Sequence, residues 1–431
     1  MPHPPAVVRT PDREAEALAE IAATRISGAT AGALIAAFLV ALLAGPALEL
    51  ALPAKSRPAP APLPARAAGG ARPLRVRLAE LTKAVDRYSA LARNLRPVVQ
   101  SPLLRSLRYG NGQVVVGRDG WLFLQESFAH TVGPGFLPAA SAPDAGGAGG
   151  GARDRPLDPL HGIVGLDRQL RRRGIRLVVL PVPEKEQVYP ERLSAGAWGA
   201  PAQNESFRPF VRRLRRAGVL VFDPATTIFA AARTDSGLYL AADTHWTPRG
   251  LDLAARALAG FLGRRLGPSL GPAAGLRRKA IELRMPVDLA VLLGLGSRTG
   301  SYFPPAAAPG FSVVGPDGEP FSALGATAPL VVLGDSFSLV YTRDAAGGGS
   351  TGFAEQLAYH LDRRVALRAR VTWNNLTNRT DWLSSEPDLL AQARVIVYEF
   401  ASRKLSEPAI WRPARLRGPE SGRAASGRTP P

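Results

Sequence analysis

The longest uninterrupted apolar stretch of the chain covers residues 26–48, which contain no charged residue. A helix rises about 1.5 Å per residue, so a helix over this stretch would cross the ~30 Å of a bilayer core. We therefore predict one transmembrane helix there, after a cytoplasmic segment over residues 1–25. A cleaved signal peptide is the alternative, but a long, partly acidic segment precedes the stretch and no small-residue cleavage site follows it.

The next part of the pattern, residues 49–105, predicts a linker and a lead-in helix. Proline and alanine dominate residues 52–66, which favours an extended spacer. Apolar residues recur at helical spacing over residues 75–95, and the predicted helix ends before Pro97. At the other end of the chain, we expect residues 406–431 to be a disordered tail.

Short apolar runs alternate with amphipathic segments between these two regions, over residues 106–405. The runs that read as buried strands cover residues 176–182, 219–223, 329–334 and 394–398. Helical spacing separates several of them, most clearly over residues 251–262. This alternation predicts an α/β domain with a mainly parallel sheet.

Charge and composition narrow the classes of partner. The net charge of +19 comes mostly from arginine, and it favours anionic partners. We find no aromatic-and-basic pattern typical of an RNA-binding sheet, so nucleic acid is disfavoured. The absence of cysteine excludes disulfides, thiolate catalysis and cysteine-ligated zinc. With five histidines in the whole chain, a histidine-based metal site is also disfavoured, and we expect neither a metal nor a cofactor.

The segment 330–338 carries the first candidate for chemistry. Gly334, Asp335 and Ser336 follow an apolar run that reads as a buried strand. Ligands bind at the carboxyl ends of the strands in open parallel sheets. A serine at that edge, at the start of the next helix, has its own amide free to stabilise an oxyanion. Ser336 is therefore a candidate nucleophile, and an ordinary serine N-cap is the alternative.

Asp243 and His245 form the second candidate, on a loop that enters the helix predicted over residues 251–262. An aspartate two positions before a histidine can accept the Nδ1 proton, which fixes the tautomer and turns Nε2 toward a nucleophile. Two alternatives stay open at this point. Asp243 could cap the helix beside a packed His-Trp pair, or the two residues could ligate a metal.

Five motifs, taken in order, resemble those of alginate O-acetyltransferase proteins of the AlgJ/AlgX type. They cover residues 117–124, 183–191, 243–246, 334–338 and 398–405. The Asp-x-His motif precedes Gly-Asp-Ser, which is the reverse of the order in ordinary SGNH hydrolases. The resemblance implies an SGNH-hydrolase-like, flavodoxin-like three-layer domain over residues 106–405.

The resemblance also implies roles for single residues. Ser336 would be the nucleophile, His245 the general base and acid, and Asp243 the orienting carboxylate. A further set would bind the oxyanion or the sugar, namely Gly334, Asn374, Asn375, Lys185, Tyr189, Trp246 and Arg403. For the last four of these residues, packing and ion pairing is an equal alternative.

The function that these features imply is O-acetylation of an exported polysaccharide through a serine acyl-enzyme. The acceptor is expected to be anionic, although the resemblance does not imply alginate itself, and a membrane-bound acyltransferase would supply the acetyl groups. The counts of Lys and Arg around the span favour a cytoplasmic domain. Arginine is abundant throughout, however, and the chemistry suits a single-pass protein of the inner membrane with its domain in the periplasm or outside the cell. A carbohydrate acetyl-esterase and a catalytically silent scaffold are the alternatives.

Overall fold

The computed structural model describes residues 27–51, 89–137, 158–342, 349–371, 376–412 and 415–417. The chain divides into two compact units, residues 1–98 and residues 99–431. In the first unit, helix α2 (Gly28–Ala51) is long and apolar enough to cross a membrane, judged by length and composition. Its side chains, such as Leu34, Ile35 and Phe38, are exposed. The apolar helix expected from the sequence is therefore present.

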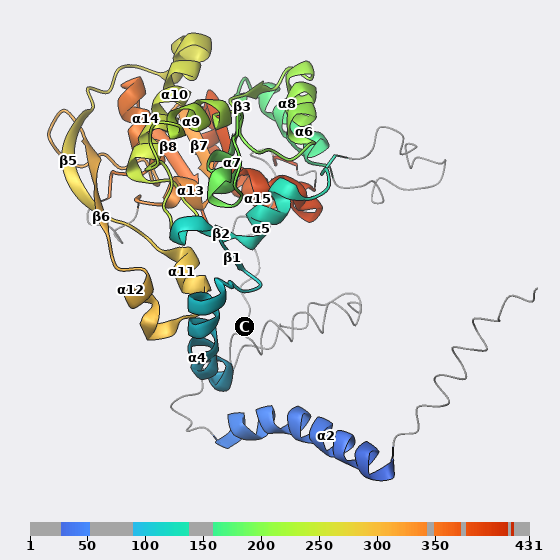
Figure 1. The fold of residues 1–431 in the computed structure, drawn as a ribbon. Helices are drawn as coiled ribbons and strands as arrows, with labels where there is room; N and C mark the ends of the chain where they lie inside the picture. Colours follow the sequence, from blue (N-terminus) through green and yellow to red (C-terminus); the bar gives the residue numbers. More distant parts are fainter. Residues whose placement is uncertain are drawn as a thin grey trace, which may run out of the picture. The chain divides into compact units, whose positions relative to one another are not determined.

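The second unit is built on five parallel strands in the order β4-β3-β9-β7-β8. Figure 1 labels β3, β7 and β8 of this sheet. Their bounds are β3 Arg176–Val182, β4 Leu220–Val221, β7 Leu330–Gly334, β8 Val365–Ala369 and β9 Val395–Ala401. The predicted α/β class with a mainly parallel sheet is confirmed. Strand β8 was not predicted, because Arg368 interrupts its short apolar run.

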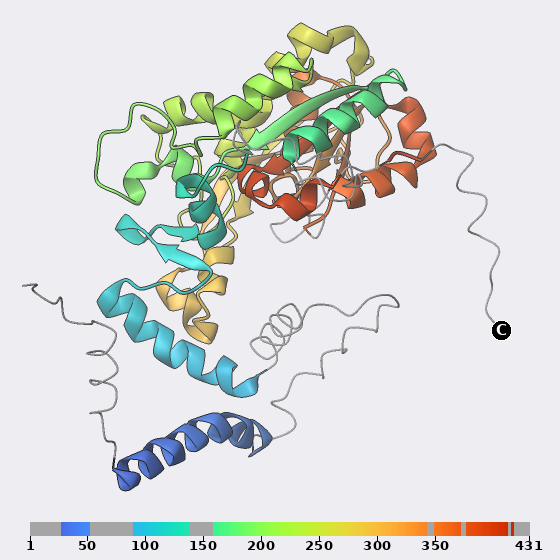
Figure 2. The same cartoon turned by 90° about the vertical axis from the view of Figure 1, so that its right-hand side faces the viewer.

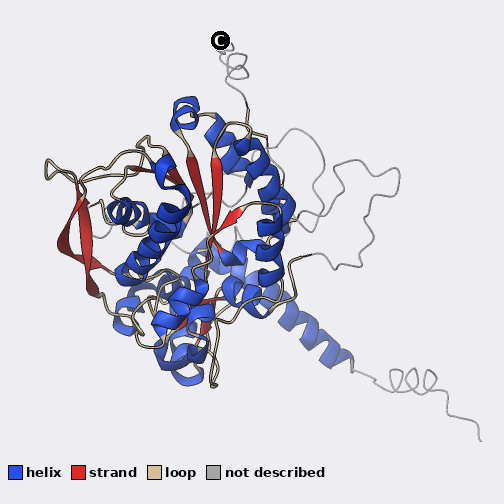
Figure 3. Ribbon diagram, turned by 90° about the horizontal axis from the view of Figure 1, so that it is seen from above, coloured by secondary structure: helices blue, strands red, loops and turns tan. Residues whose placement is uncertain are grey.

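Alternate residues of each strand point to opposite faces of the sheet, and each face is covered by helices. In β3, Val178 and Leu180 join one core while Leu177 and Val179 join the other. Helices α9 (Ala225–Ala232), α10 (Pro248–Leu266) and α14 (Phe353–Leu361) bury their apolar sides in the first core. The second core is covered by α6 (Pro159–Arg171), α8 (Phe207–Arg216), α15 (Leu376–Ser384) and α16 (Pro387–Gln392). Figure 3 shows the strands between the two helical layers, and Figure 2 shows α6 alongside β3.

Helix α10 begins where the sequence predicts. The Thr247 hydroxyl accepts the Gly250 amide at 3.1 Å, and Pro248 occupies the first turn. Both features are typical of a helix N-terminus, because the first amides have no partner within the helix. The loop that carries Asp243 and His245 is therefore fixed at the start of a long, well-packed helix.

Two antiparallel ribbons complete the second unit. The first pairs β1 (Val114–Val116) with β2 (Leu122–Leu124) and leads into α5 (Gln125–Val132). The second pairs β5 (Arg277–Arg284) with β6 (Ala307–Val314). Two short helices, α11 (Asp288–Leu292) and α12 (Thr299–Tyr302), lie between β5 and β6 in the chain.

Helix α4 (Ala90–Leu107) corrects the predicted lead-in helix, because it runs through Pro97 instead of ending before it. A proline removes one helical hydrogen bond, and tertiary contacts can outweigh that loss. The Gln100 side chain supplies such contacts by donating to the carbonyls of Tyr109 and Gly110, each at 2.9 Å. The spacer over residues 52–66 and the lead-in helix before Ser89 lie outside the described residues.

The packed structure also extends beyond residue 405, where the sequence analysis placed the start of a tail. Trp411 is buried in the second core, and its Nε1 donates to the Lys404 carbonyl at 2.9 Å. The Leu416 amide donates to the Gln169 side chain at 2.9 Å. The buried Trp411 thus holds this mostly polar segment against α6.

Candidate active site

Ser336 lies at the turn between β7 and helix α13 (Ser336–Leu339), at the carboxyl edge of the sheet. The Asp335 carboxylate shapes this turn, since it accepts the Phe337 amide through Oδ1 and the Ala401 amide through Oδ2, both at 2.9 Å. Ser336 itself is half-buried. The turn therefore presents the serine at the edge where parallel sheets bind ligands.

Gly334 is required by the close packing behind the turn. A Cβ at this position would collide with the Ser338 side chain and lie 2.8 Å from Oε2 of Glu399. That same oxygen accepts the Asp335 amide at 2.9 Å and the Ser338 hydroxyl at 2.5 Å. Gly334 thus allows the close approach of Ser338 and Glu399 at this turn. Glu399, a fully buried residue of β9, holds the turn in place.

Asp335 and Glu399, the two acids at this turn, have pKa values shifted in opposite directions. Burial raises the pKa of Glu399 well above its usual value, and the nearby charge of Asp335 raises it further. Burial also tends to raise the pKa of Asp335, but the charges of Arg379 and Arg403 outweigh it and lower that pKa. The shifts therefore favour the negative charge on Asp335 and the protonated form of Glu399.

Asp243 and His245 lie on a tight loop, in which the Leu240 amide donates to the His245 carbonyl at 3.1 Å. Oδ1 of the fully buried Asp243 accepts the His245 amide at 2.9 Å and the imidazole Nδ1 proton at 2.8 Å. This pairing fixes the tautomer in which Nε2 is unprotonated and can accept a proton.

The electrostatics of the pair suit a general base. Burial alone would raise the pKa of Asp243, but the hydrogen bond and charge of His245 lower it to about 2. Burial alone would lower the pKa of His245, but the hydrogen bond and charge of Asp243 raise it above its usual value. Asp243 thus stays ionised and stabilises the imidazolium that forms when Nε2 takes a proton.

The two motifs, far apart in the sequence, meet at the Phe337 ring. This ring lies 4.8 Å from the His245 ring and 5.1 Å from the Trp246 ring, measured between centroids. Nε2 of His245 is buried and has no hydrogen-bond partner among the described residues. The structure therefore brings His245 beside the Ser336 turn without a bond between Nε2 and the Ser336 hydroxyl. Such bonds often tighten only in the substrate complex.

The comparison with known families agrees with this arrangement. A family described as an SGNH hydrolase-like domain, acetyltransferase AlgX, matches residues 114–402. The chain belongs to this family. The SGNH-hydrolase-like class predicted from the sequence is thereby confirmed.

Named relatives of this AlgX-family chain include two described as probable alginate O-acetylase AlgJ. The protein from Pseudomonas aeruginosa is 31% identical over 150 residues, which are 35% of this chain and 33% of that protein. The protein from Pseudomonas putida is 31% identical over 156 residues, which are 36% of this chain and 35% of that protein. The chain thus spans about a third of the length of these relatives.

Two solved structures resemble the fold. The O-acetyltransferase domain of Pseudomonas putida AlgJ has a TM-score of 0.49 and 25% identity, over 72% of this chain and 96% of that one. Pseudomonas aeruginosa AlgX has a TM-score of 0.47 and 19% identity, over 67% of this chain and 61% of that one.

Lys185, a predicted sugar-site residue, lies inside the domain and supports the loop that carries Asp243 and His245. Its Nζ donates to the carbonyls of Leu240, Ala241 and Asp243 at 2.8, 3.1 and 2.7 Å. Burial lowers the pKa of Lys185 to about 7. The three carbonyls come from consecutive parts of one loop, so Lys185 fixes the path of the chain that carries Asp243.

The other predicted sugar-site residues are also buried. The Tyr189 hydroxyl donates to the Asp235 carbonyl at 2.8 Å, and Trp246 packs between Phe337 and Phe353. Arg403 donates to Glu184 at 2.9 Å, and its positive charge helps to lower the pKa of Asp335 at the Ser336 turn. These contacts favour packing and ion pairing over direct contact with sugar. Asn374 and Asn375, the predicted amide donors, lie outside the described residues.

Asp288, at the start of α11, was missed by the sequence analysis. Its Oδ1 accepts the Thr244 amide at 2.7 Å, and its own amide donates to Oδ2 of Asp243 at 2.7 Å. Nothing in the local sequence marks this aspartate, because it follows His245 by more than forty residues and meets it only through the fold. Asp243, His245 and Asp288 lie close enough to hold a metal ion. However, three of the four carboxylate oxygens already accept N–H groups.

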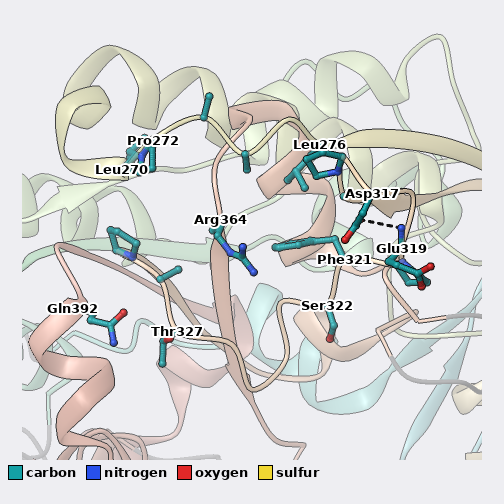
Figure 4. Close-up of a pocket in the computed structure, with 17 residues that line it drawn as sticks. Leu270, Pro272, Leu276, Asp317, Glu319, Phe321, Ser322, Thr327, Arg364 and Gln392 are labelled. Atoms are coloured by element: carbon teal, nitrogen blue, oxygen red, sulfur yellow. Dashed lines mark hydrogen bonds between the residues drawn. The ribbon is translucent and has the colours of Figure 1, made fainter.

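A hollow of about 600 Å³ lies elsewhere, between the amino ends of β7 and β8 and the neighbouring loops. Its lining includes Phe321, Arg364 and Gln392 (Figure 4). Pro329 precedes β7 and Arg364 precedes β8, so this hollow is at the opposite edge of the sheet from Ser336. It includes none of the predicted catalytic residues and does not belong to the site built from Ser336 and His245.

Proposed function

We propose that this chain transfers acetyl groups to hydroxyls of an anionic exopolysaccharide through an acyl-enzyme on Ser336. The observation that carries the proposal is the buried, unpartnered Nε2 of His245 beside the Gly-Asp-Ser turn. The Asp243 carboxylate holds the imidazole through Nδ1 at 2.8 Å, which leaves Nε2 as the ring nitrogen that can accept a proton. Membership of an acetyltransferase family favours acyl transfer as that chemistry.

In the first half-reaction, Nε2 of His245 takes the Ser336 hydroxyl proton while Oγ attacks the carbonyl carbon of an acetyl donor. The resulting oxyanion needs N–H donors. The amides of Asp335 and Phe337 already donate to carboxylates, so the Ser336 amide is the candidate donor at this turn. The tetrahedral intermediate then collapses, and the leaving group departs with the proton from the His245 imidazolium.

In the second half-reaction, a sugar hydroxyl gives its proton to His245 and attacks the acetyl carbonyl. The bond to Oγ breaks, and Ser336 recovers its proton from the imidazolium. Transfer outruns hydrolysis when the sugar hydroxyl is held on the acyl-enzyme in place of water.

The acceptor and the donor follow from the same proposal. The net charge of +19 suits an anionic polymer, and relatives described as alginate O-acetylases make alginate the first acceptor to test. The domain would act outside the cytoplasm, held to the inner membrane by α2, with a membrane-bound acyltransferase as the source of acetyl groups.

The test uses the full chain in detergent with a chromogenic acetyl ester, with and without alginate oligosaccharides. Acetylated oligosaccharide, detected by mass spectrometry, is expected for the wild type. Ser336→Ala should lower ester turnover by about 10³-fold or more, because no nucleophile remains. Ser322→Ala, which changes an exposed serine of the hollow at the other edge, is the matched control and should match the wild type.

Three results would overturn the transferase proposal. Acetate release that no acceptor diverts would favour a carbohydrate esterase. Wild-type turnover by Ser336→Ala would show that the acetyl group is not carried by Ser336. No turnover by the wild type would favour a catalytically silent scaffold.

A further inference from the structure

We infer that Asp288 is a positioning residue of the acyl-transfer site, a second carboxylate that holds the Asp243–His245 pair in place and acts on His245 from the Nδ1 side of its ring. This inference rests on the proposed function, because the role is defined by the base that His245 provides. It concerns a residue from the insertion between α10 and β7, far from both catalytic motifs in the sequence.

Reciprocal hydrogen bonds join Asp288 to the catalytic loop. The Asp288 amide donates to Oδ2 of Asp243, and Oδ1 of Asp288 accepts the amide of Thr244, both at 2.7 Å. Thr244 lies directly between the two catalytic residues, so this pair of bonds holds the loop on both sides of one peptide unit. The Asp243 carboxylate is thereby oriented with Oδ2 toward α11 and Oδ1 toward the imidazole.

The second oxygen of Asp288 faces the imidazole itself. Oδ2 lies 3.8 Å from Nδ1 of His245, too far for a hydrogen bond but close enough for strong attraction to an imidazolium. The Asp288 side chain is 39% exposed, whereas Asp243 is fully buried. Burial and the charge of Asp243 raise the pKa of Asp288, whereas the charge of His245 lowers it. The ionised form of Asp288 is therefore favoured by the imidazolium, and it adds negative charge beside the base.

The charged groups around His245 are few, so the contribution of Asp288 can be separated. Asp243 lies on the same loop, Asp288 on α11 and Arg403 on the segment after β9, and all three act on the pKa of His245. Asp243 and Asp288 raise this pKa, whereas Arg403 lowers it. Lys185, from α7 (Lys185–Val188), acts on the same loop by donating to the Asp243 carbonyl.

The test compares Asp288→Asn with Asp288→Ala in the full chain in detergent. Asparagine keeps an oxygen for the Thr244 amide and removes the charge, whereas alanine removes both. The pKa of His245 is read by NMR from histidine-labelled protein, with His245→Gln to assign the signal. The same titration is repeated in Ser336→Ala, where no turnover is needed.

Loss of the Asp288 charge should lower the pKa of His245 by about 0.5 to 1 unit in both variants. The rate requires unprotonated Nε2, so the acid limb of kcat/KM for the acetyl ester should move to lower pH by the same amount. Asp288→Ala should also lose about 10-fold or more in kcat, because the Thr244 amide loses its acceptor, and Asp288→Asn should recover most of this loss.

The matched control is Asp252→Asn, which removes a carboxylate bound to a different histidine, His360, at 2.7 Å. It should leave the titration of His245 unchanged. An unchanged His245 pKa in Asp288→Asn, with equal activity losses for the asparagine and alanine variants, would overturn the inference. Failure of the acyl-transfer proposal would appear separately, as wild-type turnover in Ser336→Ala.

Discussion

At the scale of single residues, three carboxyl groups around one turn and one loop have pKa values shifted in different directions. His245 lowers the pKa of Asp243 and arginines lower the pKa of Asp335, which favours their ionised forms, whereas burial raises the pKa of Glu399 and favours its protonated form. Neutral Glu399 can lie beside the Asp335 amide without adding a second negative charge under the nucleophile. The environment, and not the residue type, thus assigns each acid its role.

Glu399→Gln should fold as well as the wild type, within about 1 kcal/mol, because glutamine keeps a neutral acceptor for the Asp335 amide and the Ser338 hydroxyl. Glu399→Ala should cost about 2 to 4 kcal/mol, since both buried donors lose their acceptor. Thermal unfolding of the two variants measures the difference.

The pH dependence provides a control for this prediction. A carboxyl whose pKa is raised by folding binds its proton more tightly in the folded state, so stability falls as pH rises from the usual glutamate pKa toward the raised one. The wild type should show this loss and Glu399→Gln should not. An equal pH dependence in both proteins would mean that Glu399 is ionised in the folded state.

At the scale of elements, apolar runs predicted β3, β4, β7 and β9 because a parallel strand covered by helices on both faces of the sheet is apolar on both sides. The same rule failed for β8, where Arg368 pairs with Glu386 at 2.6 Å and so tolerates a strand position. The catalytic triad could be proposed from two local motifs. The roles of Asp288 and Glu399, and the hydrogen bonds that Lys185 makes to the Asp243 loop, could not be predicted. Their partners come from distant segments that meet only in the folded chain.

Gly334→Ala tests the strand-turn-helix element that carries Ser336. The added Cβ would force apart Ser338 and Glu399, so we expect a loss of about 1 to 3 kcal/mol in stability and a marked fall in kcat. Gly300→Ala, at an α12 position where a Cβ meets nothing within 4 Å, is the control. Full activity in Gly334→Ala would show that the turn does not depend on this close approach.

At the scale of the whole molecule, the apolar helix α2 and the α/β domain belong to separate units. The exposed apolar side chains of α2 suit lipid, whereas the domain buries its apolar residues in its own cores. These features agree with the proposal that α2 anchors the domain to a membrane.

A chain shortened to residues 89–431 should leave the membrane fraction and still hydrolyse a soluble acetyl ester at close to the rate of the full chain. Fractionation and ester turnover measure the two properties. Membrane association that survives the truncation would assign it to the domain, and lost turnover in a folded product would show that the anchor contributes to the site.

In the proposed reaction, Ser336 carries the acetyl group between donor and acceptor. This step is tested by mixing the full chain with an acetyl ester, stopping the reaction with acid during turnover, and mapping the acetylated peptides by mass spectrometry. We expect one acetyl group on Ser336, which disappears when acceptor oligosaccharide is added before the acid. Turnover that leaves Ser336 unmodified, or that places the acetyl group on another residue, would rule out the acyl-enzyme on Ser336.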